Sequence, residues 1–215
     1  MNINYKNYWR KTGLKGKWGN IYLERILLHK PQNFLEIGVF CGVTARNTCD
    51  YLKKINGNNF TYMGIDLFGG DKNSLNDEIE PTFLLNQKFS NPLKNIYYNL
   101  ILRENLNSIQ SVKKLLKKYN NNIKLIAGDT NSVLREINLM NVNFVFLDGG
   151  HSYQTVINDL RILYKSLKGK DAIILCDDYG KESFIKEVHN AINDFTNENR
   201  IRFELIENRF AELTF

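Results

Sequence analysis

Short apolar runs that alternate with stretches of helical periodicity constrain the fold of this chain more than any other feature. Such runs between polar ends are typical of strands buried on both faces, as in a parallel sheet that helices cover on each side. Two later runs are joined by a short turn and predict a hairpin. We therefore predict an α/β, Rossmann-like doubly wound sheet of about seven strands, mostly parallel with a C-terminal antiparallel hairpin. The predicted strands are 33–37, 61–65, 123–127, 144–147, 172–176, 201–206 and 210–215.

The intervals between the strands show apolar residues at helical spacing. A helix is predicted from Thr44 to a C-cap at Gly57, and another between Tyr153 and Gly169. Further helices are predicted over 21–28, over 108–119 and after a cap near 130–131. The clearest helical stripe is formed by Phe184, Val188, Ala191, Ile192 and Phe195.

The predicted domain organisation is an N-terminal arm and helix, residues 1–30, followed by one α/β domain, residues 31–215. A chain of 215 residues can bury one substantial core, and no change of composition marks a second domain. Residues 67–107 lack any clear period and are interpreted as an irregular insertion with one or two helices. An insertion at the carboxyl edge of the sheet is where a lid or substrate pocket is built. The arm is expected to pack over the domain or a partner subunit, because it carries Tyr5, Tyr8, Trp9 and Trp18.

Composition places the chain among globular proteins. Hydrophobic residues make up 43% of the chain and aromatic residues 12%, which excludes a disordered chain. No apolar run approaches the roughly 20 residues that cross a bilayer. The first residues also lack the apolar core of a signal peptide, so we expect a cytoplasmic protein with no membrane partner.

The cysteines and the positive charge point to no special site. Cys41, Cys49 and Cys176 are odd in number and form no C-x-x-C pair, which argues against a disulfide framework and a structural zinc site. We expect three buried, inert thiols. The net charge of +6 arises from lysine clusters at helical spacing, such as 113–118, which predict a solvated helix face rather than a nucleic-acid surface.

Acidic residues stand at the ends of the predicted strands. The carboxyl ends of parallel strands meet at one edge of a sheet, where open α/β folds bind ligands. Asp66 ends the second strand, where a carboxylate can accept hydrogen bonds from both ribose hydroxyls of an adenosine. The alternative is that each acid is a turn residue. The remaining strand-end acids are Asp129, Asp148, Asp177 and Asp178.

The turn after the first strand, Glu36 to Gly42, decides between classes of cofactor. A dinucleotide fold needs a second glycine two positions after the first, because the backbone approaches a pyrophosphate there. Phe40 occupies that position, which disfavours a nicotinamide-dependent oxidoreductase. The E-x-G-x-x-x-G pattern of Glu36, Gly38 and Gly42 instead resembles motif I of class I methyltransferases that depend on S-adenosylmethionine (SAM).

The ends of the fourth and fifth strands narrow this resemblance. Enzymes that methylate amino groups of nucleic-acid bases carry D/N-P-P-Y/F after strand four, whereas this chain has D-G-G-H-S-Y at 148–153. With Asp177-Asp178-Tyr179, the chain resembles the bacterial O-methyltransferases that modify sugars of macrolides, aminocoumarins and glycans, of the macrocin O-methyltransferase and methyltransferase domain 24 type. The resemblance covers 33–195, and it does not extend to the arm or to the insertion.

The resemblance implies both cofactors and their ligands. It implies SAM, with Asp129 accepting from the adenine amino group, and Mg²⁺ held by Asp148, Asp177 and Asp178. The alternatives are that Asp177 and Asp178 only cap the following turn and that no metal is used. The residues predicted to bind SAM are Glu36, Gly38, Gly42, Asp66, Asp129 and Asp148.

Chemistry supports the same arrangement of residues. Methyl transfer is an in-line displacement, and a sugar hydroxyl is a poor nucleophile near neutral pH. A hard cation held by carboxylates binds a vicinal diol, orients it and lowers its pKa. The catalytic candidates are Asp148, which can accept the proton, and His151 as the competing base or a substrate contact. A supporting hydrogen bond is the favoured role of His151 over that of the base.

We therefore predict a SAM-dependent, metal-assisted O-methyltransferase that acts on a sugar or other small polyhydroxy acceptor. The expected partners are this acceptor and, in a homo-oligomer, further copies of the chain. A non-catalytic, methyltransferase-like binding protein is the main alternative. Among the other polar residues, Tyr153 and Tyr179 are expected to stack on a sugar or to pack, Asp159 to form an exposed or N-terminal-side salt bridge, and His189 to have no role.

Overall fold

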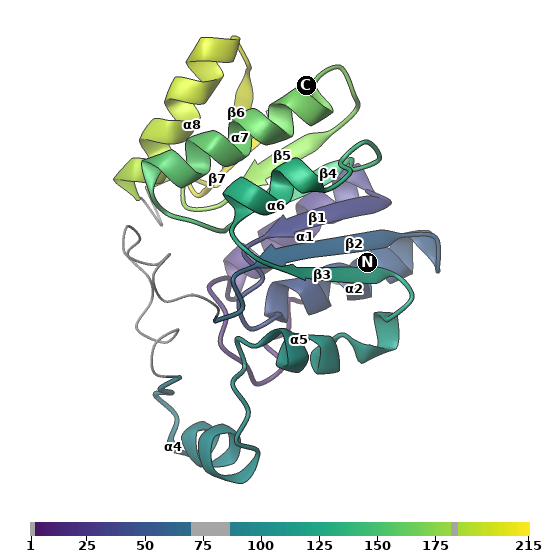
Figure 1. The fold of residues 1–215 in the computed structure, drawn as a ribbon, viewed down its shortest axis with the longest axis vertical. Helices are drawn as coiled ribbons and strands as arrows, with labels where there is room; N and C mark the ends of the chain where they lie inside the picture. The colour runs from purple at the N-terminus through teal and green to yellow at the C-terminus, as the bar shows by residue number, and fades with distance from the viewer. Residues whose placement is uncertain (1–2, 70–86, 182–184) are drawn as a thin grey trace.

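The computed structural model describes residues 3–69, 87–181 and 185–215. Within these residues, seven strands form one sheet in the order β3-β2-β1-β4-β5-β7-β6 (Figure 1). Neighbouring strands are parallel from β3 to β5, whereas β7 is antiparallel to β5 and to β6. The predicted doubly wound sheet with a C-terminal hairpin is confirmed. The strands are β1 Asn33–Ile37, β2 Thr61–Asp66, β3 Ile123–Ala127, β4 Phe144–Leu147, β5 Ile173–Cys176, β6 Phe203–Ile206 and β7 Phe210–Thr214.

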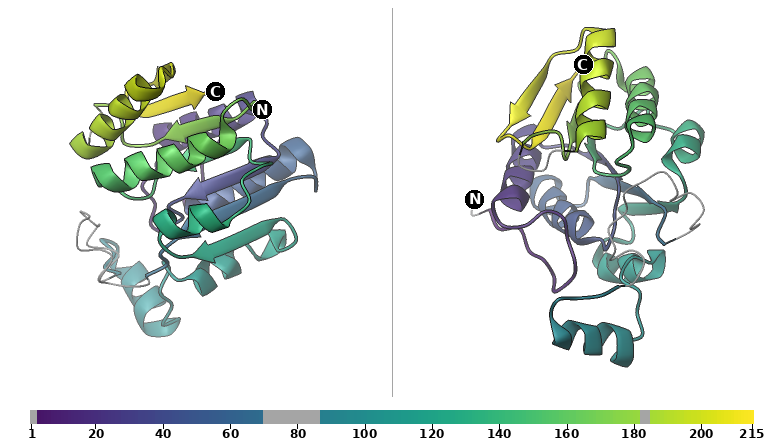
Figure 2. Two further views of the ribbon diagram at one scale, coloured as in Figure 1. Left: turned by 45° about the horizontal axis from the view of Figure 1, so that its top comes forward. Right: turned by 90° about the vertical axis from the view of Figure 1, so that its left-hand side faces the viewer.

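Helices cover both faces of the sheet (Figure 2). On one face lie α1 Lys17–His29, α2 Val43–Asn56 and α5 Ile109–Leu115, which is followed by a 3₁₀ turn, Lys117–Tyr119. On the other face lie α6 Thr130–Glu136, α7 Tyr153–Leu167 and α8 Lys186–Asn199.

The strands build two cores because successive side chains point to opposite faces. In β1, Phe34 packs with α1 and α2, whereas Leu35 packs with the helices of the other face. Both side chains are at most 1% exposed. This burial on both faces explains the continuous apolar runs seen in the sequence.

Polar caps set several helix boundaries close to the predicted ones. The hydroxyl of Ser108 accepts from the backbone N–H of Ser111 at the start of α5, and Ser152 caps α7 in the same way. Gly57 is the predicted C-cap of α2, with φ 63°. Two helix boundaries differ by several residues: α1 begins at Lys17 rather than at residue 21, and α5 ends earlier because Leu116 leaves helical geometry with ψ 6°.

The N-terminal arm packs on its own domain. Tyr5 is buried, and its hydroxyl lies 2.8 Å from the hydroxyl of Thr44 on α2. Its ring passes so close to Gly19 that a β-carbon there would lie 2.3 Å from it. The Arg10 guanidinium donates to the carbonyl oxygens of Cys41 and Ser111. The arm is therefore attached to the turn after β1 and to α5.

The described part of the predicted insertion stands off the body of the sheet (Figure 1). It contains α4, Pro92–Asn95, and a π-helix, Ile96–Ile101, whereas residues 70–86 of the insertion lie outside the described residues. Asn91 caps α4, and Pro92 occupies its first turn. Tyr98 is buried with Phe89, Leu106 and Cys41, so the insertion packs against the turn after β1.

The remaining global expectations concern cysteines and membranes. Cys41, Cys49 and Cys176 are buried free thiols, as expected. No helix in the described part of the chain is long and apolar enough to span a bilayer. Phe184, which was predicted to join the stripe of α8, lies outside the described residues, whereas its other predicted members are all buried.

Candidate active site

The site begins where the chain connections of the sheet change direction, between β1 and β4. The two strand ends touch closely, since the backbone N–H of Asp148 donates to the carbonyl of Ile37. A β-carbon at Gly38 would lie 1.9 Å from the Asp148 carbonyl oxygen, and Gly38 has φ +89°. Only glycine fits this backbone position without moving β4. The predicted turn therefore lies at the switch point of the sheet, where α/β folds bind ligands.

Asp66 holds this turn from the end of β2. One carboxylate oxygen accepts from the backbone N–H groups of Val39 and Phe40, both at 2.8 Å, and the other accepts from Phe68 at 2.6 Å. Burial raises the pKa of Asp66, while these three hydrogen bonds oppose the shift. The carboxylate thus fixes Phe40 in a left-handed conformation, φ 53°. Its contact with a ribose stays a prediction.

Glu36 lies beneath the turn, away from solvent. It is 0% exposed, and its Oε2 accepts from the Tyr62 hydroxyl at 2.7 Å. Within the described residues, Oε1 is buried without a hydrogen-bond partner. Burial raises the pKa of Glu36 to about 8. The carboxyl group therefore sits in the core under the turn, and a direct contact with SAM stays a prediction.

Gly42 and Asp129 both occupy helix N-caps. Gly42 has φ +75° before α2, and a β-carbon there would lie 3.0 Å from Val112. Asp129 is exposed, and its carboxylate accepts from the backbone N–H of Asn131 at the start of α6. The sequence predicted this cap at residue 130 or 131, one or two residues later. Contacts of Gly42 and Asp129 with SAM stay predictions.

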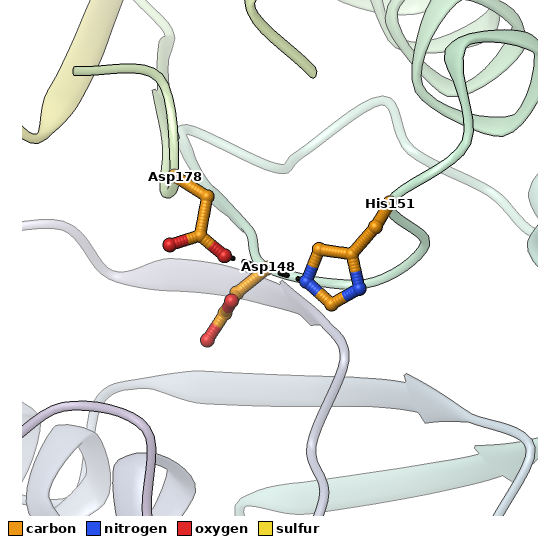
Figure 3. A group of neighbouring side chains, drawn as sticks. All are labelled: Asp148, His151 and Asp178. Carbon is orange, nitrogen blue, oxygen red and sulfur yellow. Dashed lines mark ion pairs between the residues drawn. The ribbon is translucent and has the colours of Figure 1, made fainter. Parts of the chain in front are cut away.

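Asp148, His151 and Asp178 come together at the ends of β4 and β5 (Figure 3). His151 Nε2 lies 3.3 Å from Asp178 Oδ2, and one potential ligand atom from each of the three residues lies within 4.8 Å of the others. They line a small hollow with Asp177, closed behind by apolar side chains of α7 and α8. All three are partly exposed, so the cluster faces the ligand edge.

Asp177 is paired with Arg209, and its predicted role as a metal ligand stays a prediction. Both of its oxygens accept hydrogen bonds from Arg209, at 2.6 Å each, and both side chains are buried. The predicted metal ligands were Asp148, Asp177 and Asp178, whereas the structure groups His151 with Asp148 and Asp178. The sequence predicts only that Arg209 lies in the turn between the last two strands. Its pairing with Asp177 could not be predicted, because no local pattern reveals a partner that is distant along the chain.

The charges of this cluster are partly compensated. Although Asp148 is partly exposed, desolvation of its carboxyl group by the surrounding protein raises its pKa well above the usual range, and the nearby Asp177 and Asp178 raise the pKa further. Burial also raises the pKa of Asp177 to about 6, against the lowering effect of its bonds to Arg209. Close carboxylates that repel one another form a site that favours a cation.

Comparison with known proteins identifies the family. The family model described as a methyltransferase domain matches residues 35–179. The chain belongs to this methyltransferase domain family. The matched region runs from β1 to Tyr179, so it includes the glycine turn and the acidic cluster of the methyltransferase. The resemblance to class I SAM-dependent methyltransferases predicted from the strand ends is confirmed.

Solved structures share the fold of this methyltransferase at low sequence identity. The SAH-bound methyltransferase PaMTH1 from Podospora anserina is 14% identical, with a TM-score of 0.59 over 94% of this chain and 80% of that chain. The calicheamicin methyltransferase CalS11 is 19% identical, with a TM-score of 0.59 over 90% and 76%. The O-methyltransferase NovP is 15% identical, with a TM-score of 0.58 over 92% and 80%. No curated protein sequence matches significantly.

The two tyrosines near the cluster of the methyltransferase contact side chains of α8, and stacking of either ring on a sugar stays a prediction. The Tyr153 hydroxyl donates to Asp194, and the Tyr179 hydroxyl donates to Asn193. Tyr179 also stacks on His189, at 4.6 Å between ring centroids. Asp159 is 0% exposed, so the expectation that it is an exposed residue is wrong. Asp159 lies three residues after Val156 and four before Leu163, so the helical pattern of α7 already placed it on the buried face.

Proposed function

We propose that this protein is a SAM-dependent O-methyltransferase that uses a divalent cation to methylate a hydroxyl of a sugar or other small polyhydroxy acceptor. The observation that carries the proposal is the grouping of Asp148, His151 and Asp178 at the switch point, beside the glycine turn. CalS11 is described as a TDP-rhamnose 3′-O-methyltransferase, which supports a sugar acceptor by analogy of fold.

The cofactor has its place at the ends of β1 and β2. SAM would lie along the turn that Asp66 holds, with its ribose near that carboxylate and its sulfonium toward Asp148. Gly38 and Gly42 allow the close backbone approach, Asp129 borders the adenine side, and Glu36 supports the turn from below. An acid-rich edge suits a ligand with a sulfonium cation.

The acidic cluster fits a divalent cation by its donor atoms. Asp148 and Asp178 offer hard carboxylate oxygens, which Mg²⁺ prefers. Asp177 becomes a further ligand only if it exchanges a bond to Arg209 for one to the metal. When bound, the cation supplies Lewis-acid stabilisation of an acceptor oxygen and lowers the pKa of its hydroxyl.

His151 is the residue we assign to remove the proton. The acceptor oxygen attacks the methyl carbon of SAM, the sulfonium C–S bond breaks, and S-adenosylhomocysteine leaves as a neutral thioether. The hydroxyl proton passes to the His151 imidazole, and the imidazolium is stabilised by Asp178, whose oxygen lies 3.3 Å from Nε2. Asp148 remains the alternative acceptor of this proton.

Two measurements test this function. Calorimetry should detect SAM binding, and a panel of sugars and nucleotide sugars should reveal an acceptor whose methylation stops after chelation and resumes with Mg²⁺. Tight SAM binding without turnover of any acceptor would favour the non-catalytic alternative. Methylation that survives exhaustive chelation would overturn the role of the metal. The homo-oligomer also stays a prediction, which light scattering tests.

A further inference from the structure

Arg209 lies beside the acidic cluster, on the turn between β6 and β7. We infer that Arg209 is a positioning residue, which acts through Asp177 to hold Asp178 toward His151 and Asp148. The inference rests on the proposed function, because it assigns Asp178 to the working cluster. It adds a residue outside the matched region, 35–179, to the machinery of the site.

The contact between Arg209 and Asp177 is bidentate and buried. Nε donates to Oδ1 and Nη2 donates to Oδ2, each at 2.6 Å, and the side chains are 10% and 2% exposed. The guanidinium lies 5.6 Å from the ring centroid of Trp18 and 5.5 Å from that of Phe210. This fixed fork holds both oxygens of Asp177 in one orientation, which a lysine ammonium cannot do.

Asp177 in turn holds the backbone of Asp178. Oδ1 of Asp177 also accepts from the backbone N–H of Asp178 at 2.8 Å. Asp178 has φ 59°, a left-handed conformation that is unfavourable for a non-glycine residue. The hydrogen bond compensates for part of this cost and holds the backbone that directs the Asp178 carboxylate toward His151 (Figure 3).

The backbone of Arg209 holds the same loop. Its carbonyl accepts from the backbone N–H groups of Tyr179 and Gly180, both at 3.0 Å. The contact is so close that a β-carbon at Gly180 would lie 1.9 Å from the carbonyl oxygen of Asn208. The hairpin turn and the loop after β5 therefore form one unit, which joins the C-terminal strands to the active edge.

Charge gives Arg209 a second effect. Its Nη2 lies 3.6 Å from Asp178 Oδ1, so one guanidinium faces both neighbouring carboxylates. Without it, the buried charge of Asp177 would be uncompensated and would repel Asp178 and Asp148. Loss of Arg209 should therefore move Asp178 away from its partners as well as loosen the loop.

The test compares Arg209→Lys and Arg209→Gln with Arg25→Lys in the full chain. Arg25 forms a similar bidentate pair with the buried Glu212 of β7, but it lies on α1 and has no contact with the acidic cluster among the described pairs. Mn²⁺ affinity, measured by electron paramagnetic resonance, should fall at least tenfold in both Arg209 variants and stay within twofold in Arg25→Lys. SAM affinity reports whether each variant is folded.

Structure determination keeps the inference independent of the metal. In crystals of Arg209→Gln we expect Asp178 to leave the left-handed region and its carboxylate to turn away from His151. An unchanged Asp178, or Mn²⁺ affinity within twofold of the wild-type value, would overturn the role of Arg209. Wild-type protein that binds SAM but no Mn²⁺ would instead refute the metal in the proposed function, and the crystal result would still decide on Arg209.

Discussion

At the scale of single residues, the burial of the Glu36 carboxyl group is energetically unfavourable for its charged form. This group is fully buried, and the Tyr62 hydroxyl is the donor that contacts it. A buried carboxyl group with little compensation prefers its neutral form, which explains why the pKa of Glu36 is raised to about 8. The protein therefore holds a proton beneath the glycine turn at neutral pH.

This proton predicts how stability depends on pH. The pKa of Glu36 is about 8 in the folded state and 4.5 without the protein environment, so the folded state binds the proton more tightly. Its stabilising effect is fully present below pH 4.5 and is lost as the pH rises through 8. One such group changes the free energy of unfolding by up to about 1.4 kcal/mol per pH unit within this window.

Urea denaturation at several pH values measures the effect. Glu36→Gln should become more stable relative to wild type as the pH rises from 5 to 8, because glutamine has no proton to lose. Glu204→Gln is the control, because Glu204 is 68% exposed on β6. The difference in unfolding free energy between this variant and wild type should not change with pH. Parallel stability curves for wild type and Glu36→Gln would contradict the buried proton.

Asp66 and Asp129 allow a second prediction at this scale. Asp66→Ala leaves three backbone N–H groups at the glycine turn without their acceptor, so we expect a loss of roughly 2 kcal/mol or more in stability and at least tenfold in SAM affinity. Asp129→Ala removes a helix cap worth about 1 kcal/mol. Calorimetry decides the rest: full SAM affinity in Asp129→Ala would reduce its role to the cap.

At the scale of elements, the hairpin β6–β7 supports the loop that carries Asp177 and Asp178. The hairpin was predictable, because its two apolar runs flank an obvious turn. The contact between the hairpin and β5 was not predictable. Strand periodicity reveals neither which strand the hairpin pairs with nor which side chains of its turn face that strand. The site was therefore predicted only as far as strand ends reveal it.

Gly180 tests this support. A β-carbon there would lie 1.9 Å from the carbonyl oxygen of Asn208, which is rigid backbone. Gly180→Ala should thus separate the hairpin turn from the loop, lower the melting temperature and weaken Mn²⁺ binding at least tenfold. Gly13→Ala is the matched control, because nothing lies within 4 Å of its added β-carbon. Equal Mn²⁺ affinity in both variants would show that the loop does not need the hairpin contact.

At the scale of the whole molecule, the sheet could be predicted, whereas the side-chain contacts between distant segments could not. Each parallel strand is buried on both faces, so its sequence is a continuous run of apolar residues. The strand positions could therefore be predicted directly from the sequence. Arg10 and Arg209 belong to no local pattern that predicts their contacts, and their partners lie far away in the chain. Such contacts depend on the assembled fold, which no periodicity encodes.

Arg10 gives the last prediction. It joins the arm to the glycine turn through Cys41, to α5 through Ser111 and to the insertion through Glu104, 3.5 Å away. Arg10→Ala should cost roughly 3 kcal/mol of stability, because it breaks a buried charged network, and should weaken SAM binding because Cys41 belongs to the turn. Lys17→Ala, which removes an exposed pair with Glu207, should cost about 0.5 kcal/mol or less. If denaturation and calorimetry showed equal effects for both variants, the arm would not contribute to the cofactor turn.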